Sequence, residues 1–425
     1  MNDLDRRQFM KRSLVVVGAG GVGALAGALG EAELRSGSSA PDIASESRTV
    51  SQAELLTRVP FDGPHQAGIL SKPQAQGTLI ALDSIAPNRQ LLAEALQTLS
   101  ARARGLTQGE TVGAQEIDDP PPDSGILGQI DTPDALTVTI AFGASLFDGR
   151  YGLSARKPAR LQHMPNFPND ELDPQRTHGD VLLQICAEHR DTVVHAVREL
   201  MRTVAGRLTP RWSIDGFQST KRGPTPRNSP RNLFAFRDGT ANPDTEDARL
   251  MNSLIWVQRG SSEPSWAVGG TYQVVRMIRM HVEFWDRVGM FEQQNMIGRD
   301  RVTGAPLGGD DEFEDPHYEL DPKGTRIPLN AHIRLANPRT QPTAEERIVR
   351  RGYNYDRGMD PAGDLDQGLV FVAFNQDVKR QFATIQERLA EEPMVDYITP
   401  VGGGYFFAPP GSSGPGDWVG SRLFV

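Results

Sequence analysis

The chain is poor in cysteine. Cys186 is the single cysteine among 425 residues, so no disulfide can form within the chain. The patterns CxxC, CxxCH and HExxH are absent, which excludes a usual c-type haem attachment, a cysteine zinc site and a zincin motif. Cys186 ends the apolar run 181–186, where we expect a buried small hydrophobic side chain. The fold must therefore be stabilised by its core.

An excess of positive charge is also lacking. The formal net charge is −9, and an acidic surface argues against a nucleic-acid backbone as the partner. Hydrophobic residues make up 38% of the chain, which is enough for a sizeable core. The length predicts two or three domains, or one large duplicated unit.

The N-terminal apolar run is short. Residues 14–29 fall below the roughly 20 residues that a membrane span needs. Arg6 and Arg7, followed by Phe9 and Lys11, resemble a twin-arginine export signal. We therefore expect residues 1–50 to be this signal and a disordered leader. We also expect the mature protein in a periplasm, outside the cell or at its surface.

The rest of the chain reads as an α+β fold in which one pattern occurs twice. Apolar runs and amphipathic periodicity predict the order β-α-β-β-α-β in each half. In the first half, the predicted elements are strand 77–83, helix 88–106, strands 136–142 and 180–187, helix 190–206 and strand 212–217. In the second half, they are strand 272–282, helix 283–296, strands 331–335 and 368–374, helix 377–389 and strand 404–408. This is a duplicated ferredoxin-like fold, with domains at 51–218 and 219–425.

Among the eight histidines, His332 has the most informative surroundings. It lies in a short strand-like piece that ends at Asn337-Pro338, a turn signal, and Arg334 and Arg339 follow it closely. A neutral imidazole beside fixed cations suits a haem, because iron binds the imidazole nitrogen and arginines bind the propionates. A structural histidine is the open alternative.

Two further clusters combine charged and aromatic side chains. Asp238-Gly239 follows two phenylalanines in the stretch 232–243, and Arg350 and Arg351 precede two tyrosines in the stretch 348–355. Each also has a plain structural interpretation. The first can be a tight turn with a solvated aspartate, and the second a surface ion pair beside an aromatic core.

At these three clusters the chain resembles the dye-decolorizing peroxidase family, and most closely its exported branch associated with ferrous-iron uptake, also described as deferrochelatases. The stretch 235–239 is similar to the family's GxxDG signature, but Ala235 replaces the first glycine. That replacement is mild at negative φ and disruptive at positive φ. The stretch 402–407, Gly-Gly-Gly-Tyr-Phe-Phe, also agrees with the family, and the likeness runs from about residue 50 to the C-terminus.

The resemblance implies one haem b per chain, bound in the C-terminal half, and a peroxidase reaction with hydrogen peroxide and an unknown electron donor. His332 would be the proximal iron ligand, with Asp396 a weaker candidate for the carboxylate behind it. Asp238 would be the distal acid–base residue and Arg350 the distal arginine. Two groups of neighbours would line the cofactor, on the distal side Gly239, Thr240 and Ala241, and at the haem edge Asn337, Pro338 and Arg339.

Three alternatives stay open at this stage. The first is release of iron from haem with the porphyrin left intact, which can coexist with peroxidation. The second is a non-catalytic haem or iron carrier, which needs His332 but neither Asp238 nor Arg350. The third is an exported ferredoxin-like domain without haem. The resemblance also leads us to expect a homodimer and contacts with components of a ferrous-iron uptake system.

Overall fold

The computed structural model describes residues 51–109, 117–222 and 229–425, and the predicted signal and leader lie outside these ranges. Residues 50–425 form one compact unit. Its nine described strands belong to one antiparallel sheet with the order β5-β9-β2-β3-β1-β4-β7-β8-β6. Because β5 also pairs with β8, the sheet closes on itself. Within the described ranges, no helix has the length and apolar character to span a membrane.

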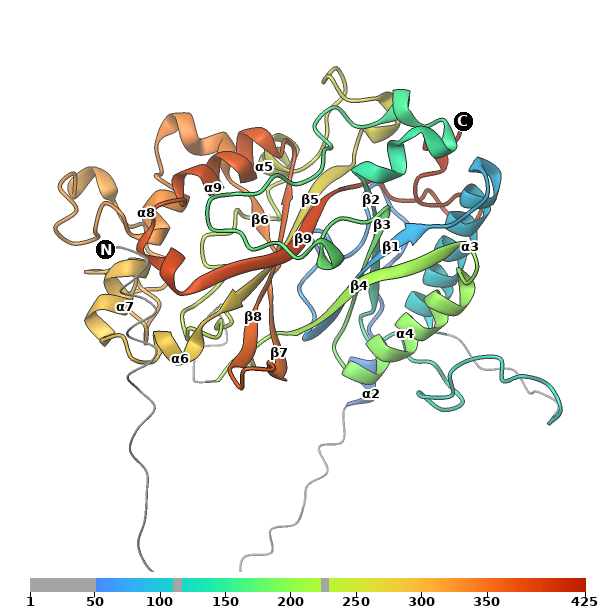
Figure 1. Ribbon diagram of the computed structural model, residues 1–425, viewed down its shortest axis with the longest axis horizontal. Helices are drawn as coiled ribbons and strands as arrows, with labels where there is room; N and C mark the ends of the chain where they lie inside the picture. Colours follow the sequence, from blue (N-terminus) through green and yellow to red (C-terminus); the bar gives the residue numbers. More distant parts are fainter. Residues whose placement is uncertain (1–50, 110–116, 223–228) are drawn as a thin grey trace, which may run out of the picture. The chain divides into compact units, whose positions relative to one another are not determined.

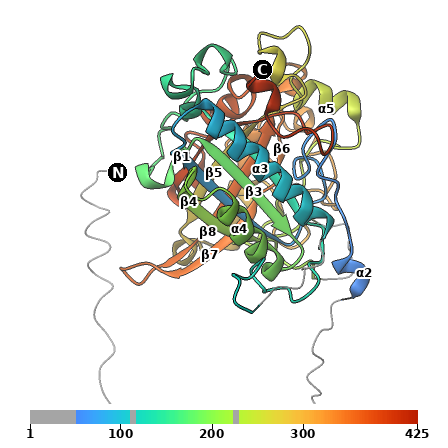
Figure 2. The ribbon, with the colours of Figure 1, turned by 90° about the vertical axis from the view of Figure 1, so that its right-hand side faces the viewer.

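The first half forms the predicted pattern element by element (Figure 1). Its elements are β1 (Gln76–Ser84), α3 (Arg89–Gln108), β2 (Thr137–Gly143), β3 (Val181–Ala187), α4 (Arg190–Thr203) and β4 (Leu208–Phe217). Every residue of β2 and β3 is buried, because α3 and α4 cover one face of these strands and the second half covers the other (Figure 2). Cys186 lies in β3 and is fully buried, as predicted.

The second half repeats the order with a more broken helical layer. Its elements are β5 (Thr271–Met280), α6 (Val282–Trp285), α7 (Met290–Ile297), α8 (His332–Ala336), β6 (Val349–Arg350), β7 (Tyr353–Met359), β8 (Leu365–Asn375), α9 (Thr384–Arg388) and β9 (Ile398–Ala408). A π-helical turn, Lys379–Ala383, leads into α9. Two short helices lie outside the repeat, α2 (Gln52–Leu55) and α5 (Ala248–Leu254).

One predicted element is wrong. The sequence pattern predicts the middle strand of the second half at 331–335, but those residues belong largely to helix α8, and the middle strand is β7. A run of five apolar-rich residues fits one helical turn as well as a short strand, so its pattern alone cannot decide. The true strand has only Tyr353 and Tyr355 as large buried side chains, and its second half is exposed. The fold is nevertheless the predicted duplicated ferredoxin-like α+β fold.

Of the four core clusters among the described residues, the two largest hold the sheet together. The interior of the closed sheet joins the two halves, with Leu79 and Leu182 from the first half in one cluster with Val275 and Phe374 from the second. The outer cluster packs the apolar faces of α3 and α4 against the sheet. Burying a large aliphatic side chain contributes about 1.5–3 kcal/mol, so this core can stabilise the fold without disulfides.

Candidate functional site

The loop that carries Asp238 follows a tight turn at Ala235. Ala235 has φ = +67°, and its backbone N–H donates to the carbonyl of Asn232 at 2.9 Å. A left-handed backbone costs a residue with a Cβ atom roughly 1–2 kcal/mol. Alanine at the motif's first glycine position therefore strains the backbone, as expected for a replacement at positive φ. Gly239, at φ = +94°, makes the second left-handed turn directly after Asp238.

Asp238 and Arg350 form an ion pair although 112 residues separate them. Nη1 of Arg350 donates to Oδ1 of Asp238 at 2.8 Å, and both side chains are about a quarter exposed. Asn242 holds the arginine's backbone from the same loop, because its amide donates to the carbonyl of Arg350 and accepts from its N–H. The loop and β6 are thus fixed to each other at the point where the two charged groups meet.

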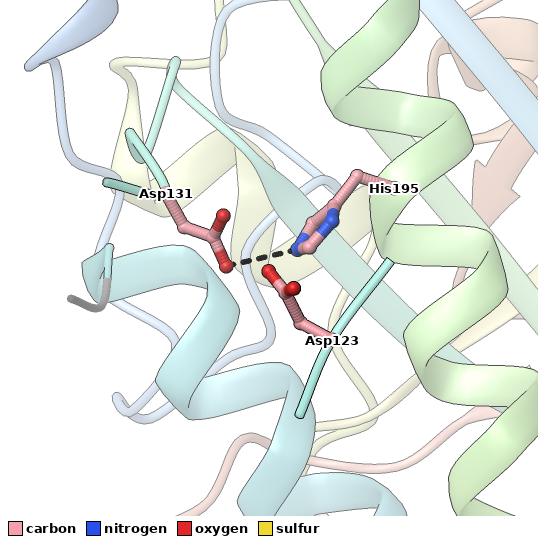
Figure 3. Close-up of side chains that lie close together, drawn as sticks. All are labelled: Asp123, Asp131 and His195. Atoms are coloured by element: carbon pink, nitrogen blue, oxygen red, sulfur yellow. Dashed lines mark ion pairs between the residues drawn. The ribbon is translucent and has the colours of Figure 1, made fainter. Parts of the chain in front are cut away.

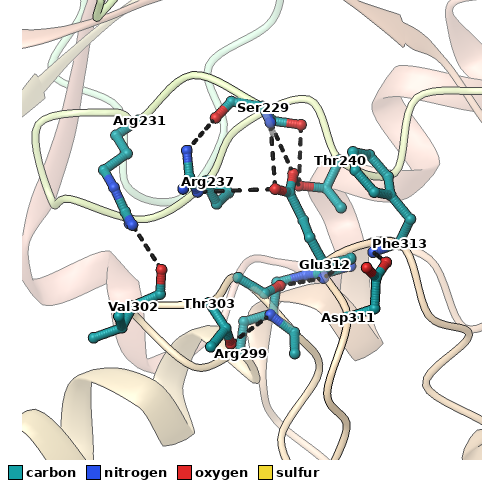
Figure 4. A network of polar contacts seen from close by, with 12 residues as sticks. Ser229, Arg231, Arg237, Thr240, Arg299, Val302, Thr303, Asp311, Glu312 and Phe313 are labelled. Atoms are coloured by element: carbon teal, nitrogen blue, oxygen red, sulfur yellow. Dashed lines mark hydrogen bonds and ion pairs between the residues drawn. The ribbon is translucent and has the colours of Figure 1, made fainter. Parts of the chain in front are cut away.

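A buried carboxylate, Glu312, supports this loop from the other side (Figure 4). It accepts hydrogen bonds from the hydroxyl of Thr240 at 2.8 Å and from the backbone N–H of Ser229 at 3.1 Å. Nε of Arg237 lies 3.8 Å from the same carboxylate, and Arg299 donates to the Glu312 carbonyl at 2.8 Å. Burial of a charge is tolerable only with such partners, so Glu312 links residues on both sides of Asp238.

His332 is the first residue of α8 and has a buried carboxylate behind it. Nδ1 of His332 lies 2.6 Å from Oε2 of Glu392, which is 3% exposed. Burial works against the charged imidazole, but the charge of Glu392 and its hydrogen bond outweigh burial and raise the pKa of His332. Among the described residues, Nε2 has no hydrogen-bond partner. The ring is therefore oriented by one nitrogen and available through the other.

The carboxylate behind His332 is not the predicted one. Asp396 is exposed and lies one turn after Glu392 along the chain, and it is Glu392 that contacts Nδ1. Glu392 precedes the short 3-10 helix Pro393–Asp396 and Asp396 ends it, so the choice depends on which side chain this turn directs inward. The expectation for Asp396 is wrong.

The three central predicted residues converge. The charges of Arg350 and Asp238 both act on the pKa of His332, the arginine lowering it and the aspartate raising it. Asp238, Gly239, Asn242 and Arg350 line a cavity of about 520 Å³. A histidine with a free Nε2 thus lies near an acid and an arginine that open onto a cavity.

The remaining predicted residues lie in two places, beside Asp238 and at the end of α8. Thr240 lies beside Asp238, but its hydroxyl points to Glu312, and Ala241 is exposed. Asn337 ends α8, and its side chain accepts from the backbone N–H of Arg339 at 3.3 Å. Arg339, at φ = +56°, pairs with Asp315 at 2.9 Å. Pro338 follows the helix end, as the turn signal predicts.

Several cations gather at this site. Burial lowers the pKa of Arg299, and the charges of Arg339 and Arg350 lower it further, whereas Tyr318 and Glu312 act in the opposite direction. The charges of Arg339 and Arg350 both act on Arg299, and such a group of arginines suits an anionic ligand with more than one charge. Together with the free Nε2 of His332, they fit a haem, which carries an iron atom and two propionates.

Sequence reasoning missed Glu392, Glu312 and the clamp formed by Asn242. Glu392 lies 60 residues after His332, and nothing in its own neighbourhood marks it. Glu312 lies in an acidic, glycine-rich segment that looks like ordinary surface. Asn242 stood inside the recognised stretch 232–243, so a search for amide side chains that clamp a backbone could have found it.

Comparisons with known proteins give the family. The models of the Dyp-type peroxidase N-terminal and C-terminal domains match residues 66–218 and 229–413. The deferrochelatase of Escherichia coli (strain K12) is 44% identical over 427 residues, which is 100% of this chain and 97% of that protein.

Solved structures agree with the family match. The crystal structure of the DyP-type peroxidase from Cellulomonas bogoriensis is 38% identical, with a TM-score of 0.77, covering 87% of this chain and 99% of that one. The ferric form of a Streptomyces lividans protein is 32% identical, with a TM-score of 0.78, covering 88% of this chain and 100% of that one. The chain belongs to the Dyp-type peroxidase family and is a haem-dependent peroxidase.

Proposed function

We propose that this chain binds haem b through His332 and uses Asp238 and Arg350 to reduce hydrogen peroxide, with electrons supplied by dye-like or other bulky donors. The observation that carries the proposal is the Arg350–Asp238 pair, 2.8 Å apart, whose charges both act on His332. A non-catalytic carrier needs the histidine alone and gives no reason for this pair.

The proximal residues hold and tune the ligand. Glu392 accepts the Nδ1–H of His332 and so leaves the Nε2 lone pair for iron. A carboxylate behind a ligating histidine fixes its orientation and increases its electron donation. The convergent arginines, Arg299 and Arg339 among them, would meet the propionates.

The residues that line the cavity handle protons and charge. Asp238 accepts one proton from hydrogen peroxide and returns it to the oxygen that leaves as water, which is general acid–base work. Nη1 of Arg350 offers positive charge where negative charge develops as the O–O bond breaks. Asn242 and Glu312 hold these two groups in place and reduce the reorganisation needed during the reaction. When bound, haem would supply the redox chemistry: peroxide would be reduced by two electrons, and the donor would replace them.

Release of iron from haem is a second candidate, because relatives that cover the whole chain at 44% identity are deferrochelatases. We infer that the same pocket serves it. Anaerobic incubation with haem, followed by chromatography of the pigment and a ferrous-iron assay, would distinguish the two activities. Intact metal-free porphyrin with free iron supports the second role, whereas unchanged haem rejects it.

We further propose export by the twin-arginine pathway, a location in the periplasm or outside the cell, a homodimer, and contact with components of a ferrous-iron uptake system. The paired Arg6 and Arg7 support the export route. The homodimer and the uptake partners are proposed from the family resemblance alone. Replacement of both arginines by lysine should keep the protein inside the cell. Sedimentation analysis should give twice the chain mass.

The absorption spectrum of the purified protein, before and after one equivalent of hydrogen peroxide, tests the main proposal. We expect a Soret band that shifts rapidly on mixing and recovers when a donor is added. A Soret band that peroxide leaves unmoved would favour the carrier. A pyridine haemochrome spectrum other than that of haem b would contradict the cofactor assignment.

A further inference from the structure

A second histidine and two carboxylates come together in the first half, away from the residues that line the cavity. Asp123 and Asp131 lie in the segment between α3 and β2, and His195 lies on α4. All three are buried, with exposed fractions of 7%, 4% and 1%. One possible ligand atom from each lies within 4.8 Å of the other two, and Figure 3 shows both carboxylates beside the His195 ring.

Asp123 has an oxygen that the described residues leave unsatisfied. Its Oδ1 accepts the backbone N–H of Gly125 at 2.9 Å, but its buried Oδ2 has no hydrogen-bond partner there. Within those residues, no lysine or arginine forms an ion pair with Asp123. A buried carboxylate oxygen without a partner is costly, and native proteins rarely keep one without a reason.

His195 is oriented like a metal ligand. Its Nδ1 lies 2.6 Å from the hydroxyl of Ser124, which also accepts the backbone N–H of Ile126 at 3.3 Å. If Nδ1–H donates to this oxygen, Nε2 carries a lone pair. Nε2 lies 3.0 Å from Oδ2 of Asp131 but without the geometry of a hydrogen bond. A lone pair this close to a carboxylate is repelled by it, and a cation bound between the two groups would remove the repulsion.

We propose that Asp123, Asp131 and His195 bind one divalent transition-metal ion, of which Zn²⁺ fits best. Zn²⁺ takes imidazole and carboxylate ligands at about 2.0–2.2 Å, which puts tetrahedral donor atoms roughly 3.3 Å apart. The 3.0 Å between Nε2 and Oδ2 of Asp131 is close to that spacing. Ca²⁺ requires about six to eight oxygen ligands, and an imidazole is not among its preferred donors.

Such an ion would fasten the segment 117–131 to α4. Ser124 would hold His195 in the required orientation, as groups behind ligating histidines do. Nearby arginines already bind elsewhere, since Arg202 donates to the carbonyl of Pro122 and Arg198 to that of Ser124. This inference does not depend on the proposed haem chemistry, because none of the three ligands lines the cavity.

Calorimetric titration of the untagged holoenzyme, first dialysed against EDTA, tests the site with ZnCl₂, MnCl₂ and CaCl₂. We expect one Zn²⁺ per chain, weaker binding of Mn²⁺ and none of Ca²⁺, with a rise in Tm on adding Zn²⁺. Asp123→Asn should weaken Zn²⁺ binding by at least the roughly 10- to 100-fold that loss of a supporting contact costs. Without metal, the variant's Tm should equal or exceed that of the wild type, because a buried unpaired charge has been removed.

His189→Gln is the matched control. His189 precedes α4 and pairs with a single carboxylate, Asp134, at 2.7 Å, so Zn²⁺ binding should persist. Wild-type protein that binds no Zn²⁺, or Asp123→Asn protein that binds it equally well, would overturn the proposal. So would a metal-free Asp123→Asn protein that unfolds well below the wild type, because Asp123 would then be satisfied by the protein itself. The Soret response to peroxide should stay unchanged in every variant.

Discussion

The two halves of the molecule share one strand order but differ in the layer that covers it. In the first half, α3 and α4 run uninterrupted for 20 and 14 residues. In the second half, the corresponding positions hold α6 and α7, of 4 and 8 residues, and a π-helical turn followed by the 5-residue α9. A long segment connects α7 to β6. It contains Glu312 and then α8, which begins at His332. The duplicated frame is thus interrupted where the site is built, since functional groups concentrate on connecting segments.

Two half-buried histidines, one from each half, also differ in their partners. His332 has Glu392 at Nδ1, and this carboxylate raises its pKa. His178, in the first half, contacts the ring of His163 and has no carboxylate partner among the described residues. Burial and the charges of His163 and Arg211 lower the pKa of His178 to about 4. His332 is therefore oriented for a ligand by its carboxylate, whereas His178 has no such partner and is kept neutral.

The largest effect should follow from removing His332, the proposed iron ligand of the second half. His332→Ala removes the iron ligand, so haem affinity should fall by more than the roughly 10- to 100-fold typical of a supporting residue, and peroxidase activity should be lost. Haem titration followed by the Soret band measures this. His281→Gln, which removes a ring bonded to Thr399 at 2.9 Å in the same half, should keep haem. Equal haem affinity in His332→Ala would contradict the account.

A smaller effect should come from the carboxylate behind that histidine. Glu392→Gln leaves a neutral partner for Nδ1, so we expect activity to fall roughly 10- to 100-fold while haem stays bound. The iron reduction potential should rise, because the imidazole donates less electron density. Asp396→Asn, one turn away, should change neither quantity. The opposite ranking of the two variants would restore Asp396 as the partner.

Acid should expose the contrast between the histidines. The folded pKa of His178 lies near 4, below its unfolded value of 6.5, so protonation favours unfolding. Its contribution is fully present above pH 6.5 and is lost as pH falls toward 4. Because the ring is only half-buried, we expect about 1–2 kcal/mol. In urea unfolding at pH 7 and pH 4.5, His178→Asn should lose less stability than the wild type, and an equal loss would refute this.

The smallest effect concerns the strained turn before Asp238. Ala235→Gly should stabilise the fold by up to about 1 kcal/mol, because glycine adopts φ = +67° without the Cβ clash, although part of the gain is lost to chain entropy. Ala248→Gly at the start of α5, where φ is not positive, should destabilise by about 0.5–1 kcal/mol. Denaturant midpoints measure both. A destabilised Ala235→Gly would mean that the turn carries no strain.

Sequence reasoning succeeded where the pattern was local. Long amphipathic helices such as α3 and fully apolar strands such as β3 carry their signal within one window, so the first half could be predicted whole. The sequence did not predict strand β7, because its residues are mostly polar or exposed. Its pairing with β8 depends on contacts made only in the fold. The pattern therefore predicts the strand at 331–335 instead, where the structure has the apolar turn of α8.

The residues of the site also fall into those that local sequence predicts and those that it does not. Asp238, Arg350 and His332 stand in recognisable stretches, and the structure brings them together. Glu392 and Glu312 act across long separations, 60 residues in the case of Glu392 and His332, and their surroundings resemble ordinary surface. Partners chosen by tertiary geometry leave no local pattern, so only the folded chain identifies them.

The central claim is that Asp238 moves the proton that lets peroxide react. Stopped-flow mixing of wild-type and Asp238→Asn holoenzyme with hydrogen peroxide tests it most directly. The account predicts that both proteins show the same starting Soret band, and that the variant's band shifts roughly 10²- to 10⁴-fold more slowly. Equal rates in the two proteins, with haem equally bound, would contradict the claim and leave Asp238 as a partner of Arg350 alone.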